Sequence, residues 1–257
     1  RCPQAVYGTA CKDKRSESGG MILKRILSKI ADLFFPRRCT ICDRVIATNE
    51  GICDTCRKKV HPLRGDTCMK CGKKITGNNA HCYDCMRRDH CFERNFSVFE
   101  YPVIRESLYR FKYRGRAEYA AYYSREAYKI HGKRIMELHA DAIVPVPLHK
   151  SRLRKRGYNQ AKELAGELSL LTGVPVCDDL IKRVKPTKAL KTLDVRDRQN
   201  NLKKAFLIIQ NDVKLKTIIV VDDIYTTGAT LDAVAEVCKA AGVEYVYSLT
   251  VAVGNGL

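Results

Sequence analysis

Cysteines in closely spaced pairs are the residues of this sequence best suited to chemistry. The chain has 257 residues and 13 cysteines, eight of which form four C-x-x-C pairs: Cys39/Cys42, Cys53/Cys56, Cys68/Cys71 and Cys82/Cys85. Ten residues separate the first pair from the second, and ten separate the third from the fourth. The segment is therefore a tandem duplication. Each unit offers four thiolates to one tetrahedral ion, and such a site favours Zn²⁺.

Two other readings of these cysteines are less consistent with the sequence. Four disulfides would need an oxidising compartment, and we find no export signal. A redox site would need a single C-x-x-C pair in a βαβ context. We therefore expect two structural zinc ions with ligands paired within each unit, although a crossed pairing stays open. Gly72 suits a tight turn beside the sulfurs, whereas His81, His90 and Cys91 are expected not to be ligands.

A second group of candidate residues follows the apolar run from Ile218 to Val221. Asp222 and Asp223 stand at the end of this predicted strand, where their carboxylates can accept hydrogen bonds from a sugar diol, directly or through hydrated Mg²⁺. A hydroxyl-rich turn then leads into a helical pattern, and its backbone amides can bind a phosphate at the helix N-terminus. The predicted phosphate loop consists of Thr226, Thr227, Gly228, Ala229 and Thr230.

The elements that must position these residues alternate between strand and helix. We predict strands at Ala142–Val146, Phe206–Ile209, Ile218–Val221 and Tyr245–Val253, and helices at Gln160–Leu171 and Leu231–Ala241. This alternation is typical of an α/β fold with a mainly parallel sheet. The cysteine-rich segment before it has too few aliphatic residues to form a hydrophobic core by itself.

The N-terminal part divides into a polar tail and a predicted amphipathic helix. Residues 1–20 are aperiodic and are left outside the fold, while residues 21–36 form a basic amphipathic helix that Pro36 ends. We expect this helix to dock on the protein itself rather than on a membrane. No apolar run reaches the roughly 18 residues of a transmembrane helix, so we expect a soluble, cytoplasmic protein without a transmembrane segment.

Composition and charge limit the class of protein. At 45% hydrophobic and 29% charged residues, the chain is not an intrinsically disordered protein. Lysine and arginine number 47 against 28 acidic residues, for a formal charge of +19. An excess of this size favours polyanionic partners such as nucleic acid or phosphorylated metabolites.

The stretch from Val220 to Thr230 resembles the phosphoribosyl pyrophosphate (PRPP) motif of type I phosphoribosyltransferases, and the chain as a whole resembles the ComF family. That family joins a double zinc ribbon to a phosphoribosyltransferase-like domain. Further matches are Leu108–Arg116, Val144–His149, Arg152, Arg156–Ala161, Arg198, Asn201, Ala205 and Phe206. The resemblance implies a zinc-ribbon module at residues 37–91. It also implies a phosphoribosyltransferase-like domain at 92–257, with a parallel sheet and helices on both faces.

The resemblance also implies roles for single residues. Asp222 and Asp223 would contact the ribose hydroxyls and magnesium, and the loop from Thr226 to Thr230 would hold the 5′-phosphate. Lys150 and Arg152 lie in the segment that holds pyrophosphate in such enzymes. Arg198 belongs to a basic stretch, residues 185–201, that corresponds to a mobile loop closing over the substrate.

Two functions of different class follow from the resemblance. The first is a PRPP- and Mg²⁺-binding protein that handles single-stranded DNA in natural transformation, with other competence or DNA-processing proteins as further partners. Aromatic and basic residues alternate from Tyr109 to Arg116 and can stack on bases, or can pack in a core. The second is an active phosphoribosyltransferase with an unknown acceptor base. Sequence alone leaves turnover open, because Thr226 stands where purine-salvage members often have an aspartate.

Overall fold

The computed structural model describes residues 36–47, 50–77, 79–184, 205–209 and 214–254. The polar tail, nearly all of the predicted amphipathic helix and the basic stretch with Arg198 lie outside the described residues.

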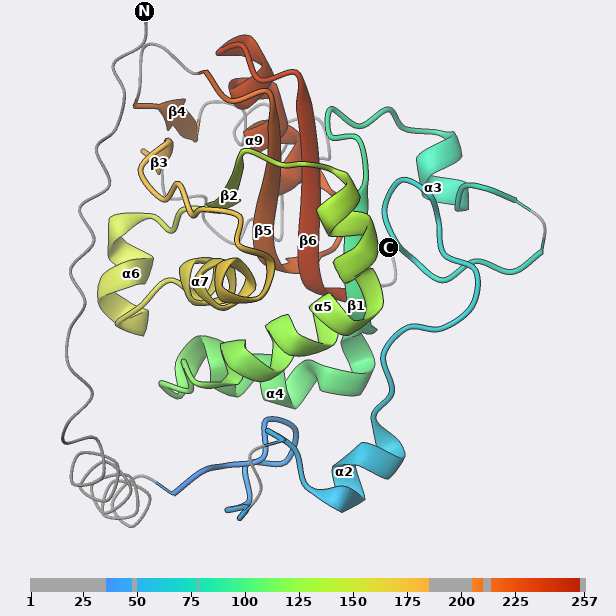
Figure 1. The fold of residues 1–257 in the computed structure, drawn as a ribbon, viewed down its shortest axis with the longest axis vertical. Coiled ribbons are helices and arrows are strands. Elements are labelled where there is room, and N and C mark those ends of the chain that lie inside the picture. The colour runs from blue at the N-terminus through green and yellow to red at the C-terminus, as the bar shows by residue number, and fades with distance from the viewer. Residues whose placement is uncertain (1–35, 48–49, 78, 185–204, 210–213, 255–257) are drawn as a thin grey trace, which may run out of the picture.

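A parallel sheet of four strands forms the centre of the fold, in the order β1-β6-β5-β2 (Figure 1). The strands are β1 (Asn95–Glu100), β2 (Ala142–Pro145), β5 (Thr217–Tyr225) and β6 (Tyr245–Val253). Each neighbouring pair is parallel, with Val144 opposite Val220 and Asp222 opposite Thr250. The carboxyl ends of β2, β5 and β6 therefore meet at one edge of the sheet, which is where ligands bind in open α/β sheets.

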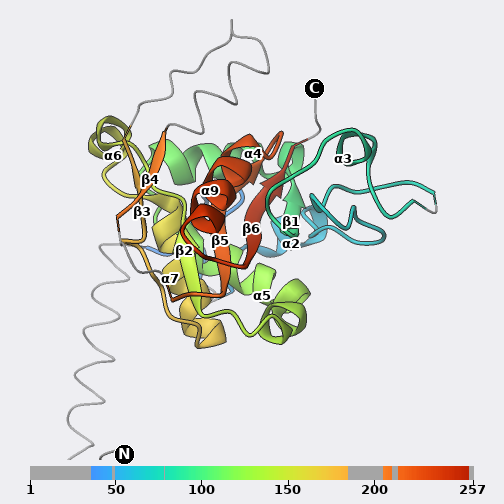
Figure 2. The ribbon, with the colours of Figure 1, turned by 90° about the horizontal axis from the view of Figure 1, so that it is seen from above.

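Helices cover both faces of this sheet. Helices α5 (Tyr119–Glu137) and α7 (Gln160–Thr172) lie on one face and α9 (Ala229–Ala240) lies on the other, as Figure 2 shows. Successive side chains of β5 point to opposite faces of the sheet and so contribute to two cores. Ile219 and Val221 belong to the first hydrophobic cluster, and Ile218 and Val220 belong to the second. The predicted fold class, a parallel α/β sheet with helices on both faces, is confirmed.

Two further helices and a small sheet complete the domain. Helix α4 (Tyr101–Tyr113) follows β1 directly, and α6 (Lys150–Arg156) follows β2. Strands β3 (Ile181–Arg183) and β4 (Phe206–Ile208) pair antiparallel in a separate two-stranded sheet. The predicted strand at 206–209 thus exists but does not join the central sheet.

The two cysteine units lie at different sides of the domain (Figures 1 and 2). The first cysteine unit (residues 37–60) includes α2 (Asp54–Lys59) and lies beside α4, whereas the second cysteine unit (residues 67–91) includes α3 (Tyr83–Met86) and lies beside β1. Cys39 and Cys56 belong to the hydrophobic cluster of α4 and α5, and Cys68 and Cys71 belong to that of α9. Each unit is therefore packed into a different core of the main domain.

Candidate functional site

The eight cysteines of the C-x-x-C pairs form two clusters of four. Within each cluster the sulfurs lie within 4.8 Å of one another, and the clusters are Cys39, Cys42, Cys53, Cys56 and Cys68, Cys71, Cys82, Cys85. The Cys42–Cys53 and Cys71–Cys82 sulfurs are 3.8 and 3.5 Å apart. Tetrahedral Zn–S bonds of about 2.3 Å place sulfurs about 3.8 Å apart. The donor set and spacing fit structural zinc, and the ligands pair within each unit as expected.

The duplication in sequence is also a duplication in geometry. Asp43 and Gly72 follow the second cysteine of each unit, both with a left-handed backbone, at φ of 63° and 75°. Their amides donate to the carbonyls of Cys39 and Cys68, at 2.8 and 3.0 Å. The tight turn expected at Gly72 is present. A side chain at that position would come within 2.9 Å of the Asn95 carbonyl, so glycine is required there.

Asp43 occupies the equivalent turn of the first unit, and its side chain also contacts α5 and the residues before it. Its carboxylate accepts a hydrogen bond of 2.6 Å from the Tyr119 hydroxyl and pairs with Arg116 at 3.0 Å. Burial raises the pKa of Asp43, but the Tyr119 hydrogen bond and the Arg116 charge outweigh it, so the pKa lies below its ordinary value. Ser107 and Arg110 of α4 donate to the carbonyls of Thr40 and Ile41. The first cysteine unit is thus held on α4 and α5 by polar contacts.

The second cysteine unit reaches the start of α9 through His90. The His90 Nδ1 atom lies 2.9 Å from an Asp232 oxygen, and Nε2 lies 3.3 Å from the Tyr225 hydroxyl. Cys91 donates its backbone amide to Asp232 at 2.9 Å. His90 lies outside the cysteine clusters, as expected, and instead connects the end of this unit to the first turn of α9.

Asp222 and Asp223 lie within the last part of the pairing between β5 and β6, because β5 continues past them to Tyr225 instead of ending at Val221 as predicted. Asp223 is buried, and its backbone amide donates to the Asp222 carboxylate at 2.8 Å. Burial and the neighbouring Asp223 charge both disfavour ionisation and raise the pKa of Asp222 to about 7. A pair of adjacent carboxylates in the interior needs compensating charge from other elements.

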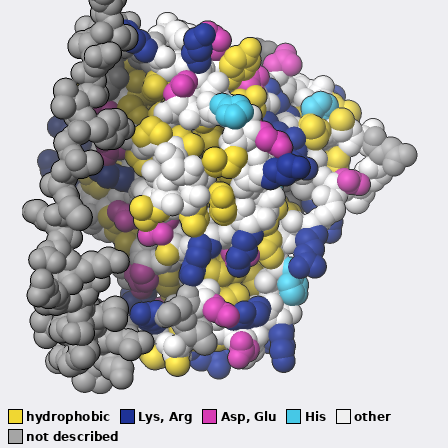
Figure 3. All heavy atoms as spheres, in the orientation of Figure 1, with side chains coloured by type: hydrophobic (Ala, Val, Ile, Leu, Met, Phe, Trp, Pro, Cys, Tyr) yellow, Lys and Arg dark blue, Asp and Glu magenta, His cyan; other side chains and the backbone are white. Residues whose placement is uncertain are grey.

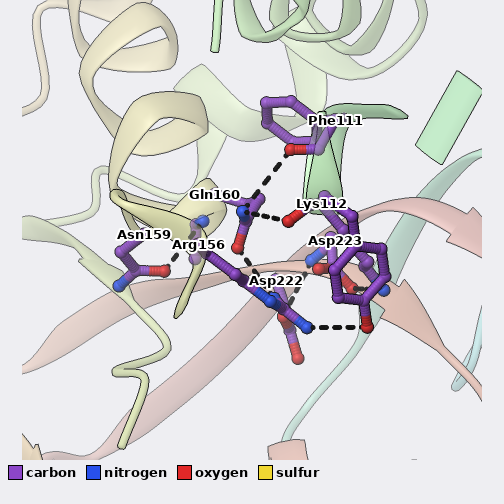
Figure 4. A network of polar contacts seen from close by, with 9 residues as sticks. Phe111, Lys112, Arg156, Asn159, Gln160, Asp222 and Asp223 are labelled. Carbon is purple, nitrogen blue, oxygen red and sulfur yellow. Dashed lines mark hydrogen bonds and ion pairs between the residues drawn. The ribbon is translucent and has the colours of Figure 1, made fainter. Parts of the chain in front are cut away.

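Lys112 of α4 supplies that charge to Asp223. Its ammonium lies 2.8 Å from the Asp223 carboxylate oxygen (Figure 4). Burial lowers the pKa of Lys112, but the Asp223 charge outweighs it and the pKa is raised. From the sequence, Lys112 belongs to a stretch expected either to contact DNA or to pack in the core. Helical spacing shows on which side of the helix it lies, because buried Leu108 and Phe111 put Lys112 at the border of the apolar face.

The predicted phosphate loop runs from the end of β5 into α9. Gly228 precedes the helix with φ of 78°, and a Cβ there would lie 2.7 Å from the Tyr225 hydroxyl and 2.9 Å from His90. Only glycine fits this close approach. Thr226 is exposed, while Thr227, Ala229 and Thr230 are partly exposed. The loop therefore presents hydroxyls and a helix N-terminus next to the acidic pair, an arrangement that can hold a phosphate.

Basic residues lie on two further elements, α6 and β3. Lys150 and Arg152 stand in the first turn of α6, which follows β2, the neighbour of β5. Arg183 of β3 is buried against the Phe206 ring, 5.1 Å from its centroid. Burial and the charge of Arg152 lower the pKa of Arg183, whereas the charge of Asp222 raises it. Arg183 was not among the residues predicted from sequence, because only folding brings its strand to this edge.

A polar network fixes α4 and α6 beside the acidic pair (Figure 4). Gln160, at the start of α7, donates to the carbonyls of Phe111 and Lys112, each at 3.4 Å. Its side-chain oxygen accepts from Arg156 at 2.8 Å. Arg156 also donates to the Tyr113 hydroxyl at 3.2 Å and lies over that ring. The end of α4 that carries Lys112 is therefore held in place by α6 and α7.

Comparison with known proteins agrees with this architecture. Residues 30–86 match the double zinc ribbon domain family, and residues 124–256 match the phosphoribosyl transferase domain family. Competence protein F of Haemophilus influenzae is 32% identical over 225 residues, covering 82% of this chain and 94% of that protein. Competence protein ComFC of Bacillus subtilis is 31% identical, covering 73% and 77%. DNA utilization protein YhgH of Escherichia coli is 29% identical, covering 79% and 91%.

The fold and the matched domains define a phosphoribosyltransferase-domain protein that carries a double zinc ribbon with two four-cysteine clusters. Among such proteins, the identity to competence protein F over most of both chains is decisive, and the chain belongs to the ComF family. In the part of the chain that the structure describes, no helix is long and apolar enough to cross a membrane.

Proposed function

We propose that this protein binds PRPP, together with Mg²⁺, at the carboxyl edge of its parallel sheet. The observation that carries the proposal is the junction of β5 and α9, where the strand that carries the acidic pair leads into a glycine turn with too little room for a side chain. A sugar phosphate carries both a diol and a phosphate, and a partner for each is present at this junction.

Each group of residues has a part in holding the ligand. Asp222 and Asp223 accept hydrogen bonds from the ribose hydroxyls. The amides and hydroxyls from Thr226 to Thr230 hold the 5′-phosphate, aided by the α9 dipole. Lys150, Arg152 and Arg198 neutralise the diphosphate. Mg²⁺ supplies further neutralisation of the diphosphate oxygens.

Titration calorimetry with PRPP and Mg²⁺ tests this proposal. We expect saturable one-to-one binding by the wild type and a loss of at least about tenfold in affinity for Asp222→Asn/Asp223→Asn, since two hydrogen-bonded charged acceptors are removed. A matched control is Asp178→Asn, which changes a carboxylate in the loop after α7. No binding by the wild type, or equal binding by the double variant, would contradict the proposal.

We further propose that the protein handles single-stranded DNA in natural transformation, on the cytoplasmic side of the membrane, together with other competence or DNA-processing proteins. The relatives named for competence and DNA utilization support this role. A hollow of about 450 Å³ between α4 and the first cysteine unit adds structural support, with a lining of Asp43, Glu106, Tyr109, Arg110, Arg114 and Arg116.

Some aromatic and basic residues of α4 lie at the surface around this hollow, and others are buried in the core. Tyr109 and Tyr113 are 49% and 48% exposed with ring centroids 5.2 Å apart, while Phe111 is fully buried. Arg110 and Arg116 hold the first cysteine unit and also border the hollow. Figure 3 shows that lysine and arginine side chains are spread over the visible face rather than gathered in one patch. Exposed rings beside basic groups suit base stacking along a strand.

Binding of labelled oligonucleotides at several salt concentrations tests the DNA role. We expect Tyr109→Ala/Tyr113→Ala to weaken single-strand binding by roughly 2 kcal/mol or more, since stacking on each ring contributes about 1–3 kcal/mol. Tyr245→Ala, a 50% exposed tyrosine far along the sheet, is the control. We also expect affinity to fall steeply with salt. A flat salt response, or equal losses in both variants, would count against this surface.

The second candidate function is transfer of ribose 5-phosphate from PRPP to a nitrogenous base. The cations of α6, the helix that follows β2 next to β5, favour it, since a pyrophosphate leaving group needs neutralisation. Release of pyrophosphate from PRPP in the presence of a panel of bases is the measurement. Pyrophosphate release that depends on one base would establish turnover. No release with any base would contradict transfer and leave PRPP binding as the function.

A further inference from the structure

We propose that Lys112 is a specificity-determining residue of the sugar-phosphate site, a built-in cation that reserves the acidic pair for a ribose diol and keeps divalent metal away from Asp223. This inference deepens the proposed function and rests on it for the identity of the sugar. It implies that Mg²⁺ joins the site with the diphosphate of the ligand and not through these carboxylates.

The position of Lys112 is fixed by its surroundings. Its ammonium pairs with Asp223 at 2.8 Å, and the side chains of Lys112 and Asp223 are 18% and 11% exposed. Gln160 donates to the Lys112 carbonyl, and the Tyr158 hydroxyl donates to the neighbouring Phe111 carbonyl. Figure 4 shows Gln160 and Asp223 beside Lys112 at the end of α4. A lysine held at both backbone and side chain is part of the site's permanent architecture.

Other cations surround the same pair of carboxylates. The charge of Arg156 acts on Lys112, and the charge of Arg183 acts on Asp222. Arg183 is only 8% exposed, so its charge is weakly screened by solvent. The two carboxylates therefore feel the charges of Lys112 on α4 and Arg183 on β3, and Arg156 on α6 adds a further positive charge next to Lys112.

This arrangement treats a metal ion and a diol differently. A divalent ion at Asp223 would sit within a few ångströms of an ammonium group, and the repulsion between them is strong away from bulk water. A diol is neutral and needs only acceptor lone pairs. An ionised carboxylate offers about four of these sites, and Lys112 occupies one oxygen of Asp223. Oxygens of Asp222 and Asp223 thus remain for the ribose hydroxyls.

Manganese binding to the zinc-loaded protein, measured by electron paramagnetic resonance of free Mn²⁺ without any sugar, tests the inference. We expect no tight Mn²⁺ site in the wild type or in Lys112→Arg, which keeps the charge. Lys112→Met should gain a site at least about tenfold tighter than any in the wild type, because the repelling charge is gone. The gain should disappear in Lys112→Met/Asp223→Asn, which removes the metal's ligand.

Equal Mn²⁺ binding by wild type and Lys112→Met would overturn the inference, as would a gain that persists in the double variant. Circular dichroism and thermal melting establish that each variant is folded, and Lys112→Arg keeps the test available if Lys112→Met does not fold. In that case, a tight Mn²⁺ site in the wild type or in Lys112→Arg would overturn it.

Calorimetry with ribose 5-phosphate, which lacks the diphosphate, is the second readout. Its affinity for the wild type should be the same with and without Mg²⁺, and for Lys112→Met it should become dependent on metal. A wild type that binds ribose 5-phosphate only with metal would overturn the inference. A wild type that binds neither this ligand nor PRPP would instead overturn the proposed function, and the Mn²⁺ comparison would still decide the role of Lys112.

Discussion

Gly228 and His131 are single residues whose environment permits little change. Gly228 has a left-handed backbone directly against Tyr225 and His90. His131 is a buried histidine of α5 whose Nε2 lies 2.9 Å from the Ser97 carbonyl oxygen. The sequence pointed to Gly228, because a glycine after two threonines at a helix start is a recognisable signal. It gave no sign of His131, whose burial depends on β1 packing against α5.

Replacing Gly228 with alanine should damage the site more than the fold. Alanine must adopt an unfavourable backbone conformation, at a cost of about 1–2 kcal/mol, and its Cβ would also collide with Tyr225. Gly173→Ala is the matched control, since it has φ of 75° with nothing within 4 Å. We expect both variants to lose free energy of unfolding, Gly228→Ala more because of the collision, but a tenfold or greater loss of PRPP affinity, about 1.4 kcal/mol, only for Gly228→Ala. Equal PRPP affinity in both variants would contradict the assignment of the phosphate loop.

His131 should make stability depend on pH. Burial lowers its pKa below the ordinary 6.5, with the charges of Arg134 and Arg94 acting in the same direction. The folded state therefore binds this proton less readily than the unfolded state, so its contribution is present above pH 6.5 and is lost as pH falls. Between pH 7.5 and 5.5, denaturant unfolding with excess zinc should show the wild type losing about 1 kcal/mol more than His131→Phe. Parallel pH curves would show that burial does not lower the pKa of His131 in the folded protein.

Helix α4 connects the core, the first cysteine unit and the acidic pair. Its buried face joins the core through Ile104, Leu108 and Phe111, its polar side holds the first cysteine unit, and its last turn brings Lys112 to Asp223. The sequence left a choice between a packing face and a DNA-binding face for this stretch. The structure divides the residues between the two sides, because a helix with 3.6 residues per turn places neighbours on different faces.

Loss of the Asp43 charge should loosen the first cysteine unit from α4 and α5. Asp43→Asn keeps a residue that tolerates the left-handed backbone but removes the ion pair with Arg116. We expect the free energy of unfolding to fall by about 1–3 kcal/mol, the usual cost of leaving a partly buried charge unpaired. Asp54→Asn, on the exposed side of α2, is the control and should change stability by less than about 0.5 kcal/mol. Equal effects of the two changes would mean that Asp43 does not anchor this unit.

In the molecule as a whole, the sequence predicted the two cysteine clusters and the parallel sheet, but only the structure shows how the cysteine units pack against the sheet domain. The C-x-x-C spacing predicted both clusters, and strand and helix periodicity predicted the parallel sheet, because both signals are local. The docking of each cysteine unit depends on contacts between residues far apart in the chain, such as Asp43 with Arg116 and His90 with Asp232. The same reason explains why Lys112 and Arg183 were not predicted to face the acidic pair.

Removal of zinc should therefore affect the entire protein. Cysteines of both clusters are part of the two hydrophobic cores, so loss of the metal exposes core surface on both faces of the sheet. We expect a strong chelator to lower the Tm of the whole protein in a single cooperative transition, followed by calorimetry, with recovery when zinc is returned. A chelated protein whose main transition stays at the same temperature would show that the cysteine units are independent of the sheet domain.

A crystal structure with PRPP and Mg²⁺ would show directly whether the edge of the sheet binds this ligand. We expect the 5′-phosphate at the amides around Gly228, the ribose hydroxyls on Asp222 and Asp223, and Mg²⁺ on the diphosphate, with Lys112 still paired to Asp223. PRPP bound elsewhere, or a metal ion bound to Asp223 in place of Lys112, would contradict it.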